Sequence, residues 1–595
     1  MSNMKRIGGP LATVTAAALL SVALPSSAAL AQKTKTPEAS ELAFQVNVPD
    51  VTVEQSTIDA DTLRAILTGD FESHAEDLAA LDAASITIPT VEVTASGEEM
   101  DDFLITYNDV TIEDVIDGVA GSVTIGSITM EDGEEFSGSF DTMSASALNI
   151  NALLGFYGFV EQSSSEFQTI YTDVTMAGGS ITTPEVTCEI GSMQVAEFSA
   201  RPLEVPFTEF MSIANQLEAS SEDDDEGEPD PELMADFLPM YIDLITSFRS
   251  APFTFDGIDC SGEDDTGEPV SVVVGPVTMG GFEPGTYPEI AVEDVSIELT
   301  EDGSVGSMAF DSFVFKGFDF SDQIDVIAGM PVSDADEWFR DNARQLIPAF
   351  AGFSISGLEM DFPDTDNEGE RIVASVGSVD LTLGDYTNGI PASIDASAEN
   401  ILVDLPADSE DEQLQQLRAM GIESVDVGFE LSMNWLAELD QIEINTLMLE
   451  EADLGSINIA GTVGNATEQL FSENNDLAMV AAMGTTAKDL QITVVDNGLT
   501  ELLLSDAAAQ QGVDVSTMRP IIAGVAEGMA IGLLGGSSDA EAVGDALSSF
   551  IRDGGTLMLD ITSLDEVGLG LADFMAAQED PTVLLEKVSI QAEAE

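Results

Sequence analysis

The feature that most constrains the fold is a stretch of sequence that the chain repeats at an offset of 100 residues (351 − 251). Residues 251–259 (APFTFDGID) correspond to residues 351–359 (AGFSISGLE). After a two-residue insertion the copies remain in step, so that Gly275 corresponds to Gly377. Such repetition is typical of supersecondary units that stack side by side, each covering the open face of the next. The repeat therefore predicts neighbouring modules that share one sheet.

Alternating apolar and polar residues in and around both copies indicate antiparallel strands. Two hairpins are predicted where Glu-Asp-Gly joins such runs, at residues 131–133 and 301–303. Glycine after Asp adopts the positive φ that a tight hairpin turn requires. The Gly-Ser-Met of residues 191–193 matches that of residues 306–308, and this match predicts a third relative of the repeat.

Helical patterns recur between the strands, as at residues 233–248 and 334–350, and they dominate after about residue 477. We therefore expect an α+β fold, in which an elongated, repeated antiparallel β-sheet carries helices packed on one face and ends in a helix-rich C-terminal cap. The apolar run of residues 520–536 contains Glu527 and several glycines, which favours a buried helix over a membrane span.

A chain of 595 residues is too long for a single compact core, and its patterns divide it into five predicted segments. These are a signal peptide at residues 1–31, an N-terminal strand and helix unit at 32–165, central repeat units at 166–350, a further repeat unit at 351–476 and the cap at 477–595. Residues 218–232 contain nine acidic residues and no basic one, and we expect an exposed loop there.

A set of apolar residues after the second predicted hairpin largely keeps strand alternation, so much of it belongs to one sheet face. Two interpretations of this apolar ladder are open. It is buried core beneath the helices, or part of its face stays open as a groove for an acyl chain. Its members are Met308, Phe310, Phe313, Phe315, Phe318 and Phe320.

The chain has a formal charge of −95, from 111 Asp and Glu against 16 Lys and Arg. This charge excludes nucleic acid as a partner, because its phosphates would be repelled, and it disfavours anionic membrane surfaces. Hydrophobic residues still make up 44% of the chain, which is enough to build a core. We therefore interpret the acidity chiefly as a solvated surface.

The N-terminus has the pattern of a secretory signal peptide. Lys5 and Arg6 precede an apolar segment at residues 11–24, and residues 29–31 (ALA) form a small-x-small cleavage site before Gln32. We expect an exported protein, periplasmic or secreted, with no transmembrane segment after cleavage. An Ala-rich helix that imitates a signal peptide is the alternative.

The two cysteines, Cys188 and Cys260, are 72 residues apart (260 − 188), and both lie in strand-like sequence. In an oxidising compartment we expect one disulfide between them. Two buried thiols are the alternative. Neither cysteine belongs to a CxxC motif or neighbours a histidine, which argues against redox or nucleophilic chemistry.

His74 is the only histidine and lies beside Glu72, Glu76 and Asp77. A surface histidine is the simpler interpretation, and a pH-sensitive pair with one of these carboxylates is the alternative. The sequence shows no dinucleotide-binding, Walker, nucleophile-elbow or zinc-protease motif. We therefore assign no catalytic residue and no cofactor.

The nearest approach to a metal site is the sequence DTDNEG that begins at Asp364. Asp364, Asp366 and Glu368 have the spacing that opens an EF-hand loop. The twelfth position would be Ser375, which lacks the bidentate carboxylate, and the flanking sequence predicts strands where helices are required. These three residues are a candidate for weak calcium binding, and a solvated acidic turn is the alternative.

The combination of a signal peptide, strand-rich repeats of about 100 residues (351 − 251) and interposed helices resembles uncharacterised exported proteins of Gram-negative bacteria. The YdgA-like proteins are among them, and the AsmA-like envelope proteins are more distant. The resemblance is one of organisation across most of the mature chain and transfers no site residue. Those families usually keep an N-terminal membrane anchor, whereas residues 29–31 indicate release.

These features together favour a non-enzymatic envelope protein that has a structural or assembly role or carries a lipid. Its partner would be an envelope protein or a lipid. A hydrolase that acts through two carboxylates is one alternative, and it requires both acids to converge in a cleft. A calcium-dependent surface protein is the other.

Overall fold

The computed structural model describes residues 43–97, 100–133, 135–162, 164–223, 231–264, 266–301, 303–329, 335–364, 371–405, 412–536, 538–579 and 582–595. The chain divides into two compact units, which we call unit 1 (Met1–Ile290 with Ile324–Asp341) and unit 2 (Ala291–Gln323 with Asn342–Glu595). Both combine antiparallel strands with helices, so the predicted α+β class is confirmed. The predicted signal peptide lies outside the described residues.

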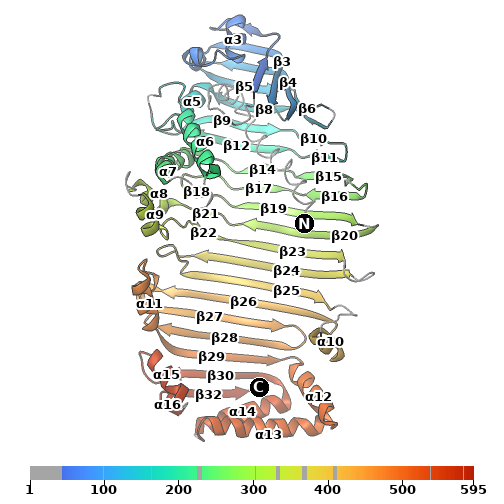
Figure 1. Ribbon diagram of the computed structural model, residues 1–595, viewed down its shortest axis with the longest axis vertical. Coiled ribbons are helices and arrows are strands. Elements are labelled where there is room, and N and C mark those ends of the chain that lie inside the picture. The colour runs from blue at the N-terminus through green and yellow to red at the C-terminus, as the bar shows by residue number, and fades with distance from the viewer. Residues whose placement is uncertain are drawn as a thin grey trace. The chain divides into compact units, whose positions relative to one another are not determined.

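Unit 1 contains many short strands and several helices (Figure 1). Its first elements are β1 (Ala43–Asn47), β2 (Thr52–Glu54), α3 (Ala60–Leu67), η2 (Glu72–His74), α4 (Ala75–Ala79), β3 (Ala83–Gly97), β4 (Met100–Val115), β5 (Val119–Ile125), β6 (Ser127–Asp132), β7 (Phe136–Phe140), β8 (Met143–Asn149) and α5 (Ile150–Phe156). Then come β9 (Gln168–Met176), β10 (Gly179–Thr182), β11 (Val186–Ile190), β12 (Met193–Ala200), α6 (Phe207–Asp223), α7 (Pro231–Thr246), β13 (Phe248–Ser250), β14 (Phe253–Phe255), β15 (Ile258–Glu263), β16 (Pro269–Val274), β17 (Val277–Met279) and β18 (Thr286–Tyr287).

Most strands of unit 2 are long, and only β3 and β4 of unit 1 are longer. The chain continues through β19 (Ile290–Glu301), β20 (Ser304–Phe315), β21 (Phe318–Asp319), α8 (Ser321–Ala328), α9 (Ala335–Asn342), β22 (Ala349–Phe350), β23 (Gly352–Pro363), β24 (Arg371–Gly384), β25 (Ser393–Asp404), α10 (Glu412–Ala419), β26 (Ser424–Leu436), η3 (Ala437–Leu439), β27 (Gln441–Glu451) and β28 (Gly455–Gly464). Of these elements, α8 from Ile324 onward and α9 as far as Asp341 belong to unit 1. The chain ends with η4 (Glu468–Phe471), α11 (Asn475–Met483), β29 (Thr486–Asp496), α12 (Leu499–Gln511), α13 (Val515–Leu533), α14 (Ser538–Asp553), β30 (Gly555–Ser563), β31 (Leu569–Gly570), α15 (Leu571–Glu579), α16 (Thr582–Leu585) and β32 (Val588–Ala594).

In the N-terminal part of unit 1, helices pack directly on a sheet face. Asp59 caps α3 by accepting hydrogen bonds from the backbone N–H groups of Asp61 and Thr62, at 3.1 and 3.0 Å. The bond from Thr62 is the main reason that the pKa of Asp59 lies below its ordinary value. Ile66 of α3 and Ile86 of β3 belong to one buried cluster. The cap thus starts the helix whose apolar side closes this core.

Both predicted Glu-Asp-Gly hairpins are present. β6 pairs with β7 so that Asp132 lies opposite Phe136, and β19 pairs with β20. Gly133 and Gly303 have φ values of +54° and +76°, the left-handed conformation that the sequence predicts.

The repeat is present in the strand register of each unit. In unit 1, Ile258 of β15 lies opposite Val274 of β16, and in unit 2 Leu358 of β23 lies opposite Val376 of β24. The first strand of each copy shows the same correspondence. Phe253 of β14 lies opposite Met279 of β17, and Phe353 of β23 lies opposite Leu381 of β24. The insertion of two residues falls between the paired positions Pro363 and Arg371, so it leaves the register of the described strands unchanged.

A glycine explains why the apolar pattern of both copies changes phase. In the second copy Ile355 and Leu358 both lie on the apolar side, although a regular strand would place residues three apart on opposite faces. Gly357 between them has φ +64°, and its counterpart Gly257 has φ +101°. Each glycine provides an irregular step that returns the apolar residues to the same face.

The predicted third relative was aligned wrongly. The alignment makes Met193 equivalent to Met308. Met193 lies opposite Phe255, the counterpart of Ile355, whereas Met308 lies opposite Met360. The pairings show that Met193 is equivalent to Phe313, which lies opposite Ile355. Three identical residues specify an alignment less strongly than the register of a whole strand does.

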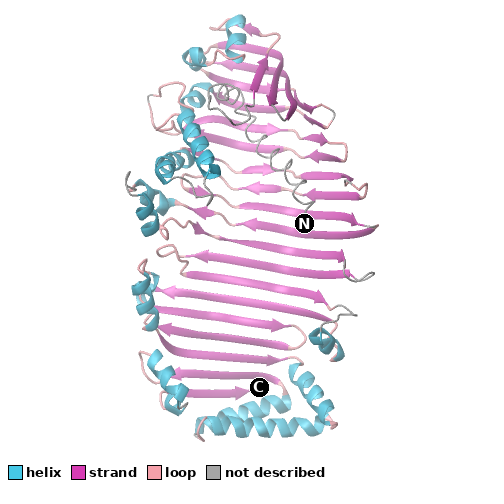
Figure 2. Ribbon diagram, in the orientation of Figure 1, coloured by secondary structure: helices cyan, strands magenta, loops and turns pink. Residues whose placement is uncertain are grey.

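In unit 2, β19 pairs with β20, and from there the sheet continues in the order β20, β23, β24, β25, β26, β27, β28, β29, β30 and β32. From β20 on, each strand is antiparallel to the next. In Figure 2 the helices α11, α15 and α16 of this unit lie beyond one set of strand ends and α10 beyond the other. Helices here border the sheet, whereas α3 and α4 of unit 1 cover one.

The C-terminal helices lie beside the last strand of unit 2. α14 lies along β32 and is followed outward by α13 (Figure 1). This arrangement shields an edge strand that would otherwise offer unpaired backbone groups to another chain. It agrees with the helix-rich end that the sequence predicts.

The prediction that residues 520–536 form a buried helix is wrong. Met518 and Ala523 of α13 are buried, but Ile521, Val525 and Met529 are 52–60% exposed. The physical reason is that α12 and α14, the described helices that contact α13, leave these three side chains uncovered. Among the described residues, no helix combines the length and the hydropathy needed to cross a bilayer.

Helix boundaries differ from prediction at two places. α6 extends to Asp223, so it takes up part of the acidic stretch expected to be a loop; residues 224–230 lie outside the described residues. α9 ends at Asn342, whereas the sequence predicts a helix as far as residue 350. Ala349 and Phe350 instead form β22, which pairs with β21.

Replacement of Gly357 tests the irregular step in the repeat. A Cβ atom at this position would lie 2.2 Å from Oδ2 of Asp311, and φ +64° is unfavourable for alanine. We expect Gly357→Ala to lower the free energy of unfolding by at least about 1–2 kcal/mol. Denaturant unfolding followed by circular dichroism measures this change.

Gly524→Ala is the matched control in the same unit. Gly524 lies in α13, and its Cβ would meet nothing within 4 Å. Alanine there should raise helix stability by about 0.5–1 kcal/mol. Equal effects of the two substitutions would contradict the role assigned to Gly357.

Candidate functional site

The most extensive chemical feature of unit 2 is one sheet face that is apolar on ten successive strands, from β20 to β32. Residues directly opposite each other in a ladder point to the same face. One such row crosses ten strands and consists of Phe313, Ile355, Val379, Ala398, Phe429, Leu449, Ile457, Val494, Leu557 and Ala594. We call the face that carries this row the apolar face.

A second row lies two residues along each strand and is equally apolar. It consists of Phe315, Phe353, Leu381, Ala396, Leu431, Leu447, Ile459, Ile492, Leu559 and Ala592. With strands about 4.8 Å apart, ten strands make each row about 43 Å long. The apolar face is therefore long enough to contact several hydrocarbon chains.

The opposite face of the same sheet is mainly polar. The row between the two apolar rows consists of Val314, Ser354, Asp380, Ser397, Glu430, Met448, Asn458, Thr493, Met558 and Glu593. We call this the polar face. An amphipathic sheet of this kind normally buries its apolar side against a second layer.

Large side chains on the apolar face remain accessible. Phe429, Leu447, Leu449 and Ile457 are 36%, 38%, 55% and 40% exposed. Their neighbours in the two rows are mostly half-buried. The apolar face thus exposes to solvent apolar side-chain area that folding usually buries.

Unit 1 shows the contrasting case. There the apolar sides of the strands form a buried cluster that includes Ile128, Phe140 and Val174, and Tyr107 is only 7% exposed within it. Burial raises the pKa of Tyr107 to about 12. The same alternation of residues therefore forms a closed core in unit 1 and an open face in unit 2.

The predicted apolar ladder divides between two places. Met308, Phe313 and Phe315 lie on the apolar face, where they oppose Met360, Ile355 and Phe353. The register breaks around Phe310. Phe318 and Phe320 lie beyond β20 in a cluster with Phe315 and Phe350, with ring centroids 5.1–5.9 Å apart. All six side chains are half-buried, which differs from a closed core.

A polar hollow lies on the other face, across β28, β29, β30 and β32. Asp489 and Asp560 come from adjacent strands, and Gln491 donates a hydrogen bond from Nε2 to Oδ1 of Asp560 at 2.8 Å. Thr562, Ser589 and Gln591 complete its polar lining. In this hollow two carboxylates lie beside amides and hydroxyls, and its lining contains no imidazole.

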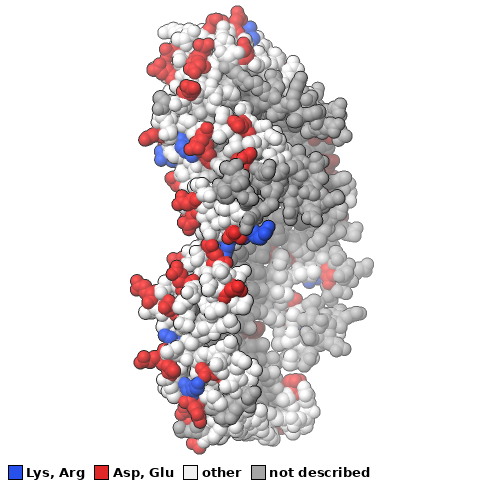
Figure 3. Space-filling model, turned by 60° about the vertical axis from the view of Figure 1, so that its left-hand side comes forward, with Lys and Arg blue, Asp and Glu red and all other residues white. Residues whose placement is uncertain are grey.

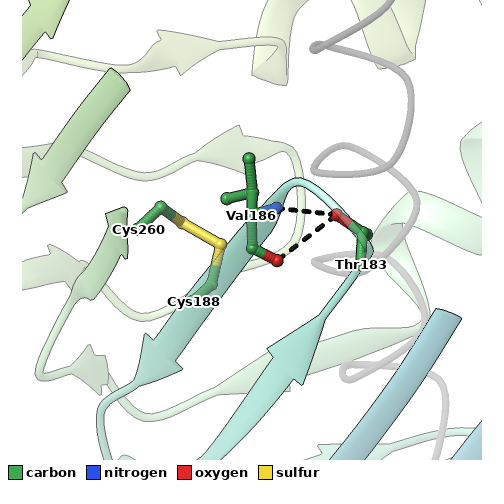
Figure 4. The surroundings of a disulfide bond; sticks show 4 residues. All are labelled: Thr183, Val186, Cys188 and Cys260. Carbon is green, nitrogen blue, oxygen red and sulfur yellow. Dashed lines mark hydrogen bonds between the residues drawn. A yellow bond between two sulfur atoms is a disulfide. The ribbon is translucent and has the colours of Figure 1, made fainter. Parts of the chain in front are cut away.

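The predicted disulfide joins Cys188 of β11 to Cys260 of β15 (Figure 4). The two residues lie directly opposite each other, with Cα atoms 4.0 Å apart, and Cys260 is 5% exposed. Thr183 holds the turn before β11, because its Oγ1 accepts from the N–H of Val186 at 3.0 Å. In the second copy of the repeat the equivalent pair is Met308 and Met360.

The calcium candidate can be located only in part. Asp364 follows β23, whereas Asp366 and Glu368 lie outside the described residues. In the corresponding loop of the first copy, Oδ1 of Asp264 accepts from the N–H groups of Thr266 and Glu268, both at 2.9 Å. The bond from Glu268 is the largest cause that lowers the pKa of Asp264. Within the described residues, no three His, Cys, Asp or Glu side chains form a cluster that could hold a metal ion.

His74 forms one of the predicted carboxylate pairs. Its Nδ1 lies 2.9 Å from Oδ2 of Asp77, and its Nε2 lies 3.8 Å from Oδ2 of Asp70. Asp70 was not among the predicted neighbours, because it precedes the helical turn and reaches the ring only when that turn forms. The pair is partly exposed and belongs to unit 1.

Comparisons with known proteins add one finding. Residues 448–595 match a family model that is described as an uncharacterized protein. This region runs from β27 to the C-terminus and therefore includes the last part of the apolar face and the helices beside β32. Comparison with curated proteins found no match.

Removal of the disulfide tests its contribution to unit 1. A link between residues 72 apart restricts the unfolded chain, so we expect Cys188→Ala with Cys260→Ala to lower the free energy of unfolding by up to about 4 kcal/mol. Denaturant unfolding of the oxidised protein and the double variant measures the difference. A reductant should destabilise the wild-type protein and leave the variant unchanged. Equal stability of all samples would contradict the prediction.

Proposed function

We propose that this chain is a non-enzymatic, exported lipid carrier of the cell envelope, and that unit 2 holds acyl chains on its apolar face. The single observation that carries the proposal is the pair of apolar rows across ten strands, with large side chains that are 36–55% exposed. Export rests on the signal-peptide pattern of the N-terminus.

The hydrophobic effect supplies the affinity. Covering a half-exposed Leu or Ile side chain contributes about 1 kcal/mol, because full burial of such a side chain contributes about 1.5–3 kcal/mol. Several such contacts along one row offset the loss of freedom that a bound chain suffers. An acyl chain lying across β26, β27 and β28 would cover Phe429, Leu449 and Ile457 together.

A hydrocarbon suits this surface better than a protein partner does. The backbone N–H and C=O groups of the inner strands are used in the ladders, and the two rows contain no polar side chain. Protein interfaces typically form about one hydrogen bond per 100–200 Å². A protein placed here would lose the hydration of its polar groups and gain no hydrogen bonds in return. An acyl chain has no such groups to satisfy.

The proposal predicts lipid in protein purified without detergent. Wild-type protein should release acyl lipid on solvent extraction, as detected by mass spectrometry. Leu449→Glu places a charge in the apolar row at a side chain that is 55% exposed, so the fold should tolerate it. We expect the lipid content to fall by about tenfold, because an acyl chain cannot solvate the carboxylate.

Met448→Glu is the matched control. Met448 neighbours Leu449 on β27 but points to the polar face, between Glu430 and Asn458. This variant makes the same chemical change on the other side of the sheet and should keep its lipid. Absence of lipid from the wild-type protein, or equal loss in both variants, would refute the proposed function.

A further inference from the structure

We infer that the apolar face of unit 2 accepts lipids whose headgroups carry no net negative charge and discriminates against anionic lipids. The inference rests on the proposed function and specifies the ligand class of that same face. It follows from where the basic side chains of unit 2 are placed.

Unit 2 has few cations with which to bind a phosphate. Its sequence contains Lys316, Arg344, Arg371, Arg418, Lys488, Arg519, Arg552 and Lys587. In the described residues five of these eight form ion pairs with carboxylates of the same unit, namely Lys316, Arg371, Arg519, Arg552 and Lys587. Arg344 and Arg418 donate to the backbone carbonyls of Ser472 and Leu405.

The basic residues of the sheet itself lie on the polar face. Lys316 contacts Asp380 and Thr382 at 2.7 and 2.6 Å, and Asp380 belongs to the polar row. Arg371 pairs with Asp361 at 2.5 Å. Asp361 lies opposite Val373 and directly follows Met360, which is on the apolar face. Asp361 therefore points to the polar face.

Lys488 is the remaining basic residue of these strands. A Cβ on Gly464 would lie 2.5 Å from Cε of Lys488. The Lys488 side chain therefore lies on the side of the sheet to which a side chain at position 464 would point. Gly464 follows Val463, an apolar-face position, and therefore faces the polar side. In the described strands of unit 2, no Lys or Arg side chain thus points to the apolar face.

The charge of the chain adds repulsion to this lack of counterions. Carboxylates are spread over the described surface in Figure 3, and the formal charge of the whole chain is −95. A headgroup phosphate about 10 Å from several carboxylates loses a few tenths of a kcal/mol to each in water. Together these terms make binding of an anionic lipid about tenfold weaker than that of a neutral lipid with the same chains. Salt should narrow the difference, since the screening length falls from about 30 Å at 0.01 M to about 8 Å at 0.15 M.

A binding experiment with two probes tests the inference. Delipidated full-length protein is titrated with diacylglycerol and with phosphatidylglycerol that carry the same fluorescently labelled acyl chain. We expect about tenfold tighter binding of diacylglycerol at low salt and a smaller ratio at 0.15 M salt. Equal binding of both probes at both salt concentrations would overturn the inference and leave the proposed function standing. Failure of both probes to bind would overturn the proposed function itself.

Two variants at one position separate charge from lost apolar contact. Leu449→Lys adds a cation to the apolar face, and its long aliphatic stem keeps part of the apolar contact. It should shift the ratio of the two affinities by about tenfold toward phosphatidylglycerol. Leu449→Gln removes apolar contact without adding charge and should leave the ratio unchanged, even if both affinities fall. An unchanged ratio in Leu449→Lys would contradict the inference.

Discussion

The constraint on which unit 2 depends is the phase of side-chain alternation, which is kept from strand to strand across the sheet. Each strand places every second residue on the same face, so a slip of one residue would exchange the two faces. The apolar residues of β23 change from odd to even positions at Gly357. The irregular step at this glycine keeps them on the same face of the sheet. Apolar rows ten strands long exist because every ladder respects this phase.

A sheet whose apolar face stays partly exposed among the described residues obtains stability from its ladders and from its protected end. The long strands satisfy one another's backbone groups, and α14 lies along the last of them, β32. The exposed apolar face contributes less than a buried one would, because its side chains stay partly hydrated. Unit 1 shows the more usual solution, in which similar strands enclose Tyr107, Ile128 and Phe140 in a core. A face left open at this energetic cost is what the proposed lipid-carrying role requires.

Sequence patterns predicted the local structure well. Asp-Gly turns located both hairpins, alternation located the long strands, and the repeat at residues 251 and 351 appears in the register of both units. The disulfide between Cys188 and Cys260 also follows from strand context and an expected oxidising compartment. The turns and strands depend on neighbouring residues, and the repeat and the two cysteines can be read from the sequence itself.

Features that depend on what packs against an element were harder to predict. Alternation shows that two faces of a strand differ, but it does not show whether a second layer covers the apolar one. For the same reason α13 was expected to be buried, although Ile521 and Met529 are exposed. The match of residues 191–193 to 306–308 failed because register, not local identity, decides which residues are equivalent. The apolar face could therefore be proposed from the ladder at Phe313 and Phe315 only as one of two interpretations.

Photo-crosslinking with a fatty acid that carries a photoactivatable group along its chain is the most direct measurement of where acyl chains bind. Peptide mapping by mass spectrometry would then locate the modified side chains. We predict crosslinks to Phe429, Leu449 and Ile457 on the apolar face, and none to Met448 or Met558 on the polar face. Crosslinks confined to the polar face, or to unit 1, would contradict the central claim that the open apolar rows of unit 2 hold the lipid.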